Sequence, residues 1–220
     1  MPDDLFEEAR NRMVDSQIRP NRVTDPRIVG AMRRLPRERF LPVSLAALAY
    51  ADQDVPLGKG RVMMQPMAIA RLVQLLAPLQ GEHALVVGAG TGYGAALLAA
   101  CGPRVTALEE DQALLAIARR VLPDVAPKVS LVSGPLAAGW PSEAPYDIIL
   151  LQGAVQQIPP AVAEQLRNDS GRLAAVISTG GRTSQAVLAE ATAAGLRAQP
   201  MFDCATPDLP SLRPAPAFVF

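Results

Sequence analysis

The stretch Leu85-Val86-Val87-Gly88-Ala89-Gly90-Thr91-Gly92-Tyr93 decides the fold. It begins as an apolar run and continues into three glycines at alternate positions. A short apolar run that ends in glycines predicts a buried strand, here over residues 83–87. Glycines directly after a strand permit a tight turn and a close approach of the backbone to a ligand. We therefore expect a strand, a ligand-binding turn and then a helix over residues 92–100.

Glu109 is the acidic partner of this glycine loop. A second apolar segment, residues 104–108, ends at Glu109, which stands 21 positions after Gly88. A carboxylate at such a strand end can accept hydrogen bonds from both hydroxyls of a ribose. The simpler alternative is a tight strand-to-helix turn beside a solvated carboxylate. Because the context and the spacing agree, we favour a nucleotide-cofactor site.

The spacing of the glycines narrows the class of cofactor. Gly92 comes one position too early for the G-x-G-x-x-G pattern of dinucleotide-binding loops, and no Gly-Lys-Ser/Thr sequence follows that would grip phosphates. The loop therefore favours a cofactor without a pyrophosphate, such as S-adenosyl-L-methionine.

The pattern around the loop predicts the rest of the fold. Strands alternate with helices from residue 83 to about residue 178, which predicts a doubly wound, mostly parallel α/β sheet. The further strands are expected at 129–132, 146–151 and 171–178, and the further helices at 112–122, with Asp111 as N-cap, and at 160–166. Before the sheet we expect helices over 3–18, from a Thr24 cap to residue 35, and from Gln65-Pro66 to residue 76, with a loop-rich segment over 37–60. The tail after residue 183 is expected to add strands.

Composition limits the classes of partner and compartment. The 220 residues carry 21 basic and 21 acidic side chains, and only 4% are aromatic, so neither nucleic acid nor a membrane is an expected partner. Cys101 and Cys204 form no disulfide framework, and no residue spacing suggests a metal site. No secretory signal or membrane-spanning run is evident. We expect a single cytoplasmic domain over residues 1–220.

Several sequence blocks then indicate a family. In chain order they are Leu35-Pro36-Arg37-Glu38-Arg39-Phe40-Leu41-Pro42, Ala49-Tyr50-Ala51-Asp52, Gly60 to Gln65-Pro66, the glycine loop, Gly139-Trp140, and Ile158-Pro159-Pro160 with Gln165-Leu166. This series resembles the protein-L-isoaspartate O-methyltransferases over about residues 24–180. The first block and the Gln-Pro pair are the parts most specific to that family, since many methyltransferases share the glycine loop.

The resemblance implies a class I methyltransferase-like fold with a helical and acceptor-loop region over 1–80 and a cofactor-binding α/β core over 81–220. It implies S-adenosyl-L-methionine as methyl donor, and as acceptor the side-chain carboxylate of isoaspartyl residues in damaged proteins. By position it assigns the acceptor loop to Met64, where the family usually has a serine, and Gln65. It assigns the cofactor contacts to Gly88, Ala89, Gly90, Gly92, Glu109 and Leu136.

The sequence departs from the family pattern at four places. Met64 has no hydroxyl to donate, Val86 stands where an acidic residue is usual, Gly134-Pro135-Leu136 replaces Gly-Asp-Gly, and Gln152-Gly153-Ala154 replaces Thr-Ala-Ala. These departures keep two alternatives open: a catalytically degenerate member that acts as a binding or scaffold protein, and a methyltransferase with a different acceptor.

Two other features have simpler interpretations. The basic cluster of Arg33, Arg34, Arg37 and Arg39 is interrupted by Glu38, which favours a solvated, salt-bridged segment over a nucleic-acid site. His83, the only histidine, falls at a strand start, where a structural role is expected. The sequence therefore offers no catalytic histidine. Methyl transfer does not require one, because an ionised carboxylate acceptor needs no strong base.

Overall fold

The computed structural model describes residues 3–179, 184–193 and 195–213. In this part of the chain, seven strands form one sheet in the order β5-β4-β3-β6-β7-β8-β9. Their bounds are β3 His83–Val87, β4 Arg104–Glu109, β5 Val129–Ser133, β6 Ile148–Val155, β7 Arg172–Ser178, β8 Ser184–Thr192 and β9 Gly195–Asp203. The strands expected from the sequence are all present, and the tail adds β8 and β9.

The sheet is mostly parallel. β3 pairs in parallel with β4 on one side and with β6 on the other, and β5 and β7 extend the parallel arrangement outward. β8 runs antiparallel to both β7 and β9. Because the chain order reverses between β3 and β6, the carboxyl end of β3 lies at a switch point, where ligands bind in open α/β sheets.

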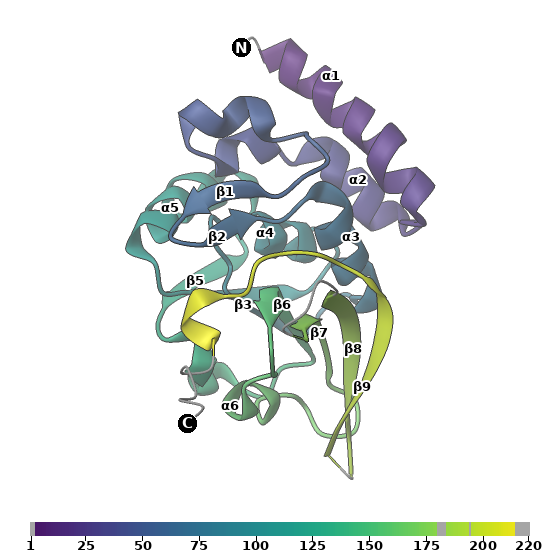
Figure 1. The fold of residues 1–220 in the computed structure, drawn as a ribbon, viewed down its shortest axis with the longest axis vertical. Helices are drawn as coiled ribbons and strands as arrows, with labels where there is room; N and C mark the ends of the chain where they lie inside the picture. The colour runs from purple at the N-terminus through teal and green to yellow at the C-terminus, as the bar shows by residue number, and fades with distance from the viewer. Residues whose placement is uncertain (1–2, 180–183, 194, 214–220) are drawn as a thin grey trace, which may run out of the picture.

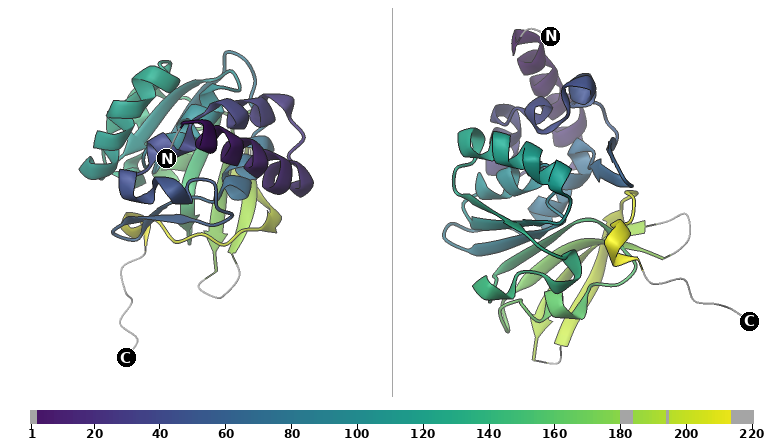
Figure 2. Two further views of the ribbon diagram at one scale, coloured as in Figure 1. Left: turned by 90° about the horizontal axis from the view of Figure 1, so that it is seen from above. Right: turned by 90° about the vertical axis from the view of Figure 1, so that its left-hand side faces the viewer.

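The long helices cover one face of the sheet, and short helices cover the other (Figures 1 and 2). The first face carries α3 Pro66–Leu75, α4 Tyr93–Ala99 and α5 Gln112–Val125. α2 Pro26–Arg34 packs on α3 and α4, and α1 Asp3–Met13 packs on α2, as an outer layer (Figure 1). The second face carries α6 Pro160–Ala163 and 3₁₀ turns such as Leu136–Ala138. Buried side chains of the N-terminal helices and of the sheet belong to one hydrophobic core.

Some element boundaries differ from the sequence expectation. Asp25, not Thr24, caps α2, because its carboxylate accepts from the Arg27 N–H at 2.8 Å, while the Thr24 N–H donates to Gln74 Oε1. The first expected helix continues from α1 as a π-helical turn, Val14–Ile18. α5 runs past Pro123 to Val125, since the Ala126 N–H still bonds to the Leu122 carbonyl.

Two further differences concern the segments beside the sheet. α6 is shorter than expected because the chain turns at Gln165 and Leu166 to form a parallel bridge with Tyr146. The segment expected as loop contains a hairpin, β1 Val55–Gly58 and β2 Arg61–Met63, whose Lys59 and Gly60 have positive φ. Figure 1 shows this hairpin above the carboxyl edge of the sheet. Among the described residues, no helix combines the length and apolar character needed to span a bilayer.

Candidate cofactor site

The glycine loop lies at the carboxyl end of β3, as expected. Gly88 and Gly90 have φ values of 73° and 60°, which a residue with a Cβ rarely adopts. The N–H groups of Gly88 and Ala89 both donate to the Leu108 carbonyl at 3.0 Å, which ties the loop to the end of β4. α4 begins directly after Gly92, so the loop joins the central strand to a helix N-terminus.

Glu109 is the last residue of β4 and lies against this loop with no exposed surface. Its Oε2 accepts from the Gly90 N–H at 2.7 Å. Its Oε1 accepts from the N–H groups of Glu110 and Asp111 at 2.9 and 3.0 Å. The structure thus brings together the carboxylate and the loop, the two features that the sequence singled out.

Arg61, at the start of β2, forms a buried ion pair with Glu109. Its Nη1 and Nη2 donate to the two carboxylate oxygens at 2.8 and 2.7 Å. Nη2 also donates to the Gly88 carbonyl at 3.1 Å, and the side chain is 7% exposed. Sequence reasoning missed this residue. The available signal was the Gly58-Lys59-Gly60-Arg61 stretch, whose glycines are typical of a hairpin turn.

A segment near the end of the described chain covers the loop from the other side. A Leu209 side-chain carbon lies 3.1 Å from the point where a Cβ on Gly88 would stand. The backbone of this segment is fixed to β6, since Leu209 N–H donates to Ala154 O at 2.8 Å and Ala154 N–H to Pro207 O at 3.0 Å. The following residue, Pro210, approaches the hairpin at Gly60.

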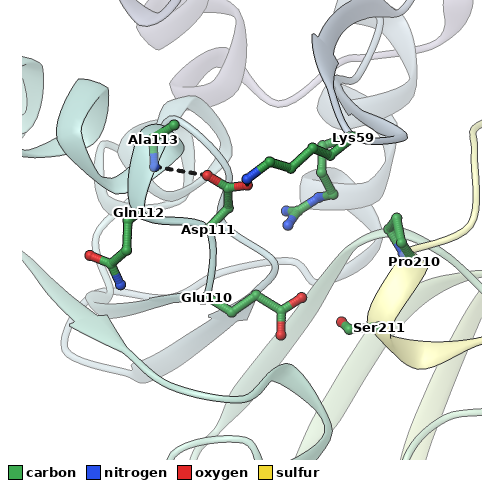
Figure 3. Close-up of a pocket in the computed structure, with 8 residues that line it drawn as sticks. Lys59, Glu110, Asp111, Gln112, Ala113, Pro210 and Ser211 are labelled. Carbon is green, nitrogen blue, oxygen red and sulfur yellow. Dashed lines mark hydrogen bonds and ion pairs between the residues drawn. The ribbon is translucent and has the colours of Figure 1, made fainter.

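A cavity of about 440 Å³ lies beside Arg61, which is one of its lining residues. Figure 3 shows the side chains around this cavity. Figure 3 shows the Lys59 side chain reaching across it toward Asp111, and the two groups form an ion pair of 2.9 Å. The lining residues are Lys59, Arg61, Glu110, Asp111, Gln112, Ala113, Pro210 and Ser211. The walls therefore come from the hairpin, from the start of α5 and from the covering segment.

Gln152 reaches the glycine loop from β6. The register of β6 against β7 shifts between Leu150 and Ala154, and such bulges redirect side chains near functional sites. Gln152 Nε2 lies 3.5 Å from the Ala89 carbonyl. Its Oε1 is buried and has no hydrogen-bond partner among the described residues. This oxygen points at Gly94 of α4, where an added Cβ would stand 2.1 Å from it, and the amide nitrogen is the atom that faces the loop.

The remaining predicted site residues lie around this centre. Leu136 is fully buried in the core of the second face. Met64 is buried in the main core, so its side chain contributes to packing. The backbone N–H of Gln65, next to it, donates to Asp54 Oδ1 at 2.7 Å, and Asp54 Oδ2 accepts from the Thr206 hydroxyl at 2.8 Å. Burial raises the pKa of the Asp54 carboxyl above its ordinary value.

The basic cluster is only partly a solvated segment. Arg33 pairs with Asp15 and Arg39 with Asp124, as expected. Arg37 contradicts the expectation: it is fully buried and donates to the carbonyls of Ala49 and Met64. The block that contains Arg37 folds as a 3₁₀ turn over Arg37–Phe40, whose buried side chains include Arg37.

His83 has a structural position. It begins β3 at the amino end of the strand, whereas the glycine loop lies at the other end. Its ring packs against Tyr146 with 4.6 Å between the centroids. Within the described residues, no group of three or more His, Cys, Asp and Glu side chains is arranged to hold a metal ion.

The sheet order, the loop at the β3 end and the acidic residue at the β4 end define a class I methyltransferase-like fold. A model of the family "Protein-L-isoaspartate(D-aspartate) O-methyltransferase (PCMT)" matches residues 8–199. The chain therefore belongs to the protein-L-isoaspartate O-methyltransferase family, as its sequence blocks indicated.

Relatives with this name support the assignment. A protein-L-isoaspartate O-methyltransferase from Methylorubrum extorquens (strain PA1) is 42% identical over 176 residues, which are 80% of this chain and 77% of the relative. One from Methanoregula boonei is 40% identical over 182 residues, 82% of each chain.

Solved structures show the same fold. A protein-L-isoaspartate O-methyltransferase superposes with a TM-score of 0.78 at 24% identity, over 94% of this chain and 67% of that one. A putative enzyme of this name from Plasmodium falciparum, solved with S-adenosyl-L-homocysteine, gives 0.73 at 17% identity, over 92% and 98% of the two chains.

Proposed function

We propose that this chain is an enzyme that transfers a methyl group from S-adenosyl-L-methionine to the side-chain carboxylate of isoaspartyl residues in damaged proteins, as a protein-repair methyltransferase. The observation that carries the proposal is the family match over residues 8–199, combined with the glycine loop and Glu109 at adjacent strand ends. This evidence favours the enzyme over a degenerate scaffold and over a methyltransferase for another acceptor.

The residues around the loop offer polar groups of the types that can hydrogen-bond to an adenosyl cofactor. Glu109 is a buried carboxylate of the kind that accepts from ribose hydroxyls at such strand ends, and in this structure Arg61 donates to both of its oxygens. The Gln152 amide nitrogen, which faces the loop, provides a polar donor beside the same site. We assign the cofactor contacts to Gly88, Ala89, Gly90, Gly92, Glu109 and Leu136, the positions that match the family pattern.

The chemistry asks little of the protein beyond positioning. The bound cofactor supplies an electrophilic methyl group on a sulfonium. An isoaspartyl carboxylate is already ionised at neutral pH, so the chain needs no general base. Its task is to hold the acceptor in line with the methyl group and to exclude water. We assign the acceptor side of this task to the Met64–Gln65 segment, which is fixed through the backbone by Asp54 and Arg37.

Labelled S-adenosyl-L-methionine and a matched pair of peptides test the proposal. The two peptides share one sequence and differ only in an isoaspartyl or an aspartyl linkage. We expect base-labile methyl ester on the isoaspartyl peptide and not on its partner. No ester on either peptide, under conditions where a proven family member reacts, would remove the proposal.

A pair of variants tests the assigned carboxylate. Glu109→Gln keeps the side-chain shape but removes the negative charge, and we expect it to lower kcat/KM for S-adenosyl-L-methionine by about tenfold or more. Asp124→Asn removes an exposed carboxylate that pairs only with Arg39 in the described part of the chain, and we expect it to retain wild-type kinetics.

The partners follow from the acceptor: we propose isoaspartyl-containing proteins or peptides. We also propose the cytoplasm as the compartment. The support is chemical, since Cys101 and Cys204 are both free thiols, which a reducing compartment preserves.

A further inference from the structure

The Glu109 carboxylate has no acceptor capacity left for a ligand. Arg61 donates to both oxygens, at 2.8 and 2.7 Å, and the N–H groups of Gly90, Glu110 and Asp111 donate to them as well. A carboxylate offers about four lone-pair positions, and here five donors already converge on them. Ribose hydroxyls would need the same oxygens. Arg61 and a ribose therefore cannot both bind Glu109 in this arrangement.

Further contacts fix the position of the Arg61 side chain. Its guanidinium makes a third hydrogen bond, to the carbonyl of Gly88, the first glycine of the loop, at 3.1 Å. The hairpin that carries Arg61 is held at its tip by the Lys59–Asp111 pair and lies against Pro210, whose Cγ is 3.2 Å from the Cβ position of Gly60. The ion pair is thus part of a cover built by the hairpin and the Leu209–Pro210 segment.

We propose that Arg61 is an internal competitor of the cofactor: it neutralises Glu109 and fills the ribose position, and it must leave Glu109 before the cofactor binds. This inference rests on the proposed function, since it concerns the same site. A buried carboxylate without a partner is strongly unfavourable, so Arg61 stabilises the cofactor-free chain. The same contact lowers the affinity for the cofactor, because binding has to break it.

The displaced guanidinium has a place to go. The neighbouring cavity of about 440 Å³ is lined by Arg61 itself and by Glu110 and Asp111. Rotation of the Arg61 side chain into this cavity exchanges Glu109 for Glu110, since Asp111 already pairs with Lys59, and it needs no unfolding of the hairpin. Arg61 thus sets the affinity of the site for its ligand, and its side chain is the part that has to move.

Titration calorimetry with S-adenosyl-L-homocysteine tests the inference without depending on catalysis. We expect Arg61→Met to bind roughly tenfold tighter or more than the wild type, because the competing charged hydrogen bonds are gone. Arg61→Gln keeps one donor nitrogen, the side-chain amide, and should fall between the two; it also serves if Arg61→Met folds poorly, which a thermal unfolding curve will show. Arg39→Met is the matched control: it makes the same substitution at an exposed arginine that pairs with Asp124 and does not line the cavity, and its affinity should stay within about threefold.

A second pair of ligands tests whether Arg61 and the ribose hydroxyls compete for the Glu109 carboxylate oxygens. 5′-Methylthioadenosine carries both ribose hydroxyls, and its 2′,3′-dideoxy analogue carries neither. If Arg61 competes with these hydroxyls, Arg61→Met should improve binding of the first compound and leave the second almost unchanged. Equal improvement for both would mean that Arg61 acts only by filling space, and would overturn the competition.

The outcomes separate the two proposals. Wild-type binding as tight as that of Arg61→Met, with isoaspartyl methylation intact, overturns the inference and leaves the function standing. If the Arg61 variants bind S-adenosyl-L-homocysteine and the wild type does not, the result supports the inference most strongly. Failure of every folded variant to bind, together with no methyl ester on the isoaspartyl peptide, overturns the function and with it the inference.

Discussion

The Cγ atom of Leu209 lies 2.7 Å from the point that a Cβ on Gly153 would occupy. Gly153 also has a φ of 145°, which L-residues rarely adopt. Gly153→Ala therefore adds both backbone strain and a steric overlap with the covering segment. We expect it to lower the free energy of unfolding by about 2–4 kcal/mol in urea titrations.

A double-mutant cycle separates the two causes. Leu209→Ala alone removes buried apolar contacts over the glycine loop and should cost about 2–3 kcal/mol. In the double variant the overlap is gone but the strain remains, so its loss should be smaller than the sum of the single losses by about 1 kcal/mol or more. Strict additivity would show that Leu209 does not rest on Gly153.

Arg37 should be a major contributor to stability, although it was expected to belong to a solvated, salt-bridged basic cluster. Its guanidinium is fully buried, donates to the carbonyls of Ala49 and Met64, and lies 4.6 Å from the centre of the Tyr93 ring. Burial lowers the pKa of this guanidinium. Arg37→Met keeps most of the volume but leaves two buried carbonyls without donors, so we expect a loss of about 2–4 kcal/mol.

The neighbouring Arg39 provides the control for that measurement. Arg39→Met breaks only an exposed ion pair with Asp124 and should change the stability by less than about 1 kcal/mol. The two variants are compared by thermal and urea unfolding under one set of conditions. Equal losses would contradict a structural role for Arg37.

The elements that were predictable from the sequence are those with strong local signals. His83–Val87 is uniformly apolar and ends in glycines, and Asp111 is a good N-cap, so β3, β4 and the start of α5 were placed correctly. The pairing of Glu109 with the glycine loop was predictable because Glu109 ends the next strand, 21 positions after Gly88, a spacing typical of nucleotide-binding folds.

The partners of Glu109 were not predictable in the same way. Arg61 is 48 positions away from it in the chain, and no periodic pattern connects a hairpin tip to a strand end. Leu209 comes from a segment whose fixed place depends on backbone bonds to β6. Arg37 was misjudged because a charged residue inside a charged cluster is usually solvated, whereas here backbone carbonyls surround it.

His83 should titrate below its ordinary value. Burial and the Arg104 charge lower the pKa of the imidazole, and the carboxylates of Glu143 and Asp147 offset this only in part. Because the chain has a single histidine, one imidazole resonance reports the titration by NMR. We expect its midpoint below the ordinary pKa of 6.5.

The sign of the resulting pH dependence follows from linkage. The folded pKa lies below the unfolded pKa, so the unfolded chain binds the proton more readily. The stability from neutral His83 is therefore present above about pH 6.5 and is lost as the pH falls through the folded pKa. A His83→Gln variant should lose less stability than the wild type between about pH 7 and pH 5. An identical loss in both proteins would contradict the lowered pKa.

Both thiols should be nearly inert in the folded protein. Cys101 and Cys204 are buried, and burial raises the pKa of each thiol to about 11. Since the thiolate is the nucleophile, alkylation by iodoacetamide at about pH 8 should be roughly 100-fold slower than for a free cysteine. Mass spectrometry counts the modified thiols over time, and the guanidinium-unfolded chain, where both should react rapidly, is the control. Rapid modification of either thiol in the folded chain would show that its surroundings open to solvent, and mapping which of the two reacts would locate the opening beside α4 or beside β9.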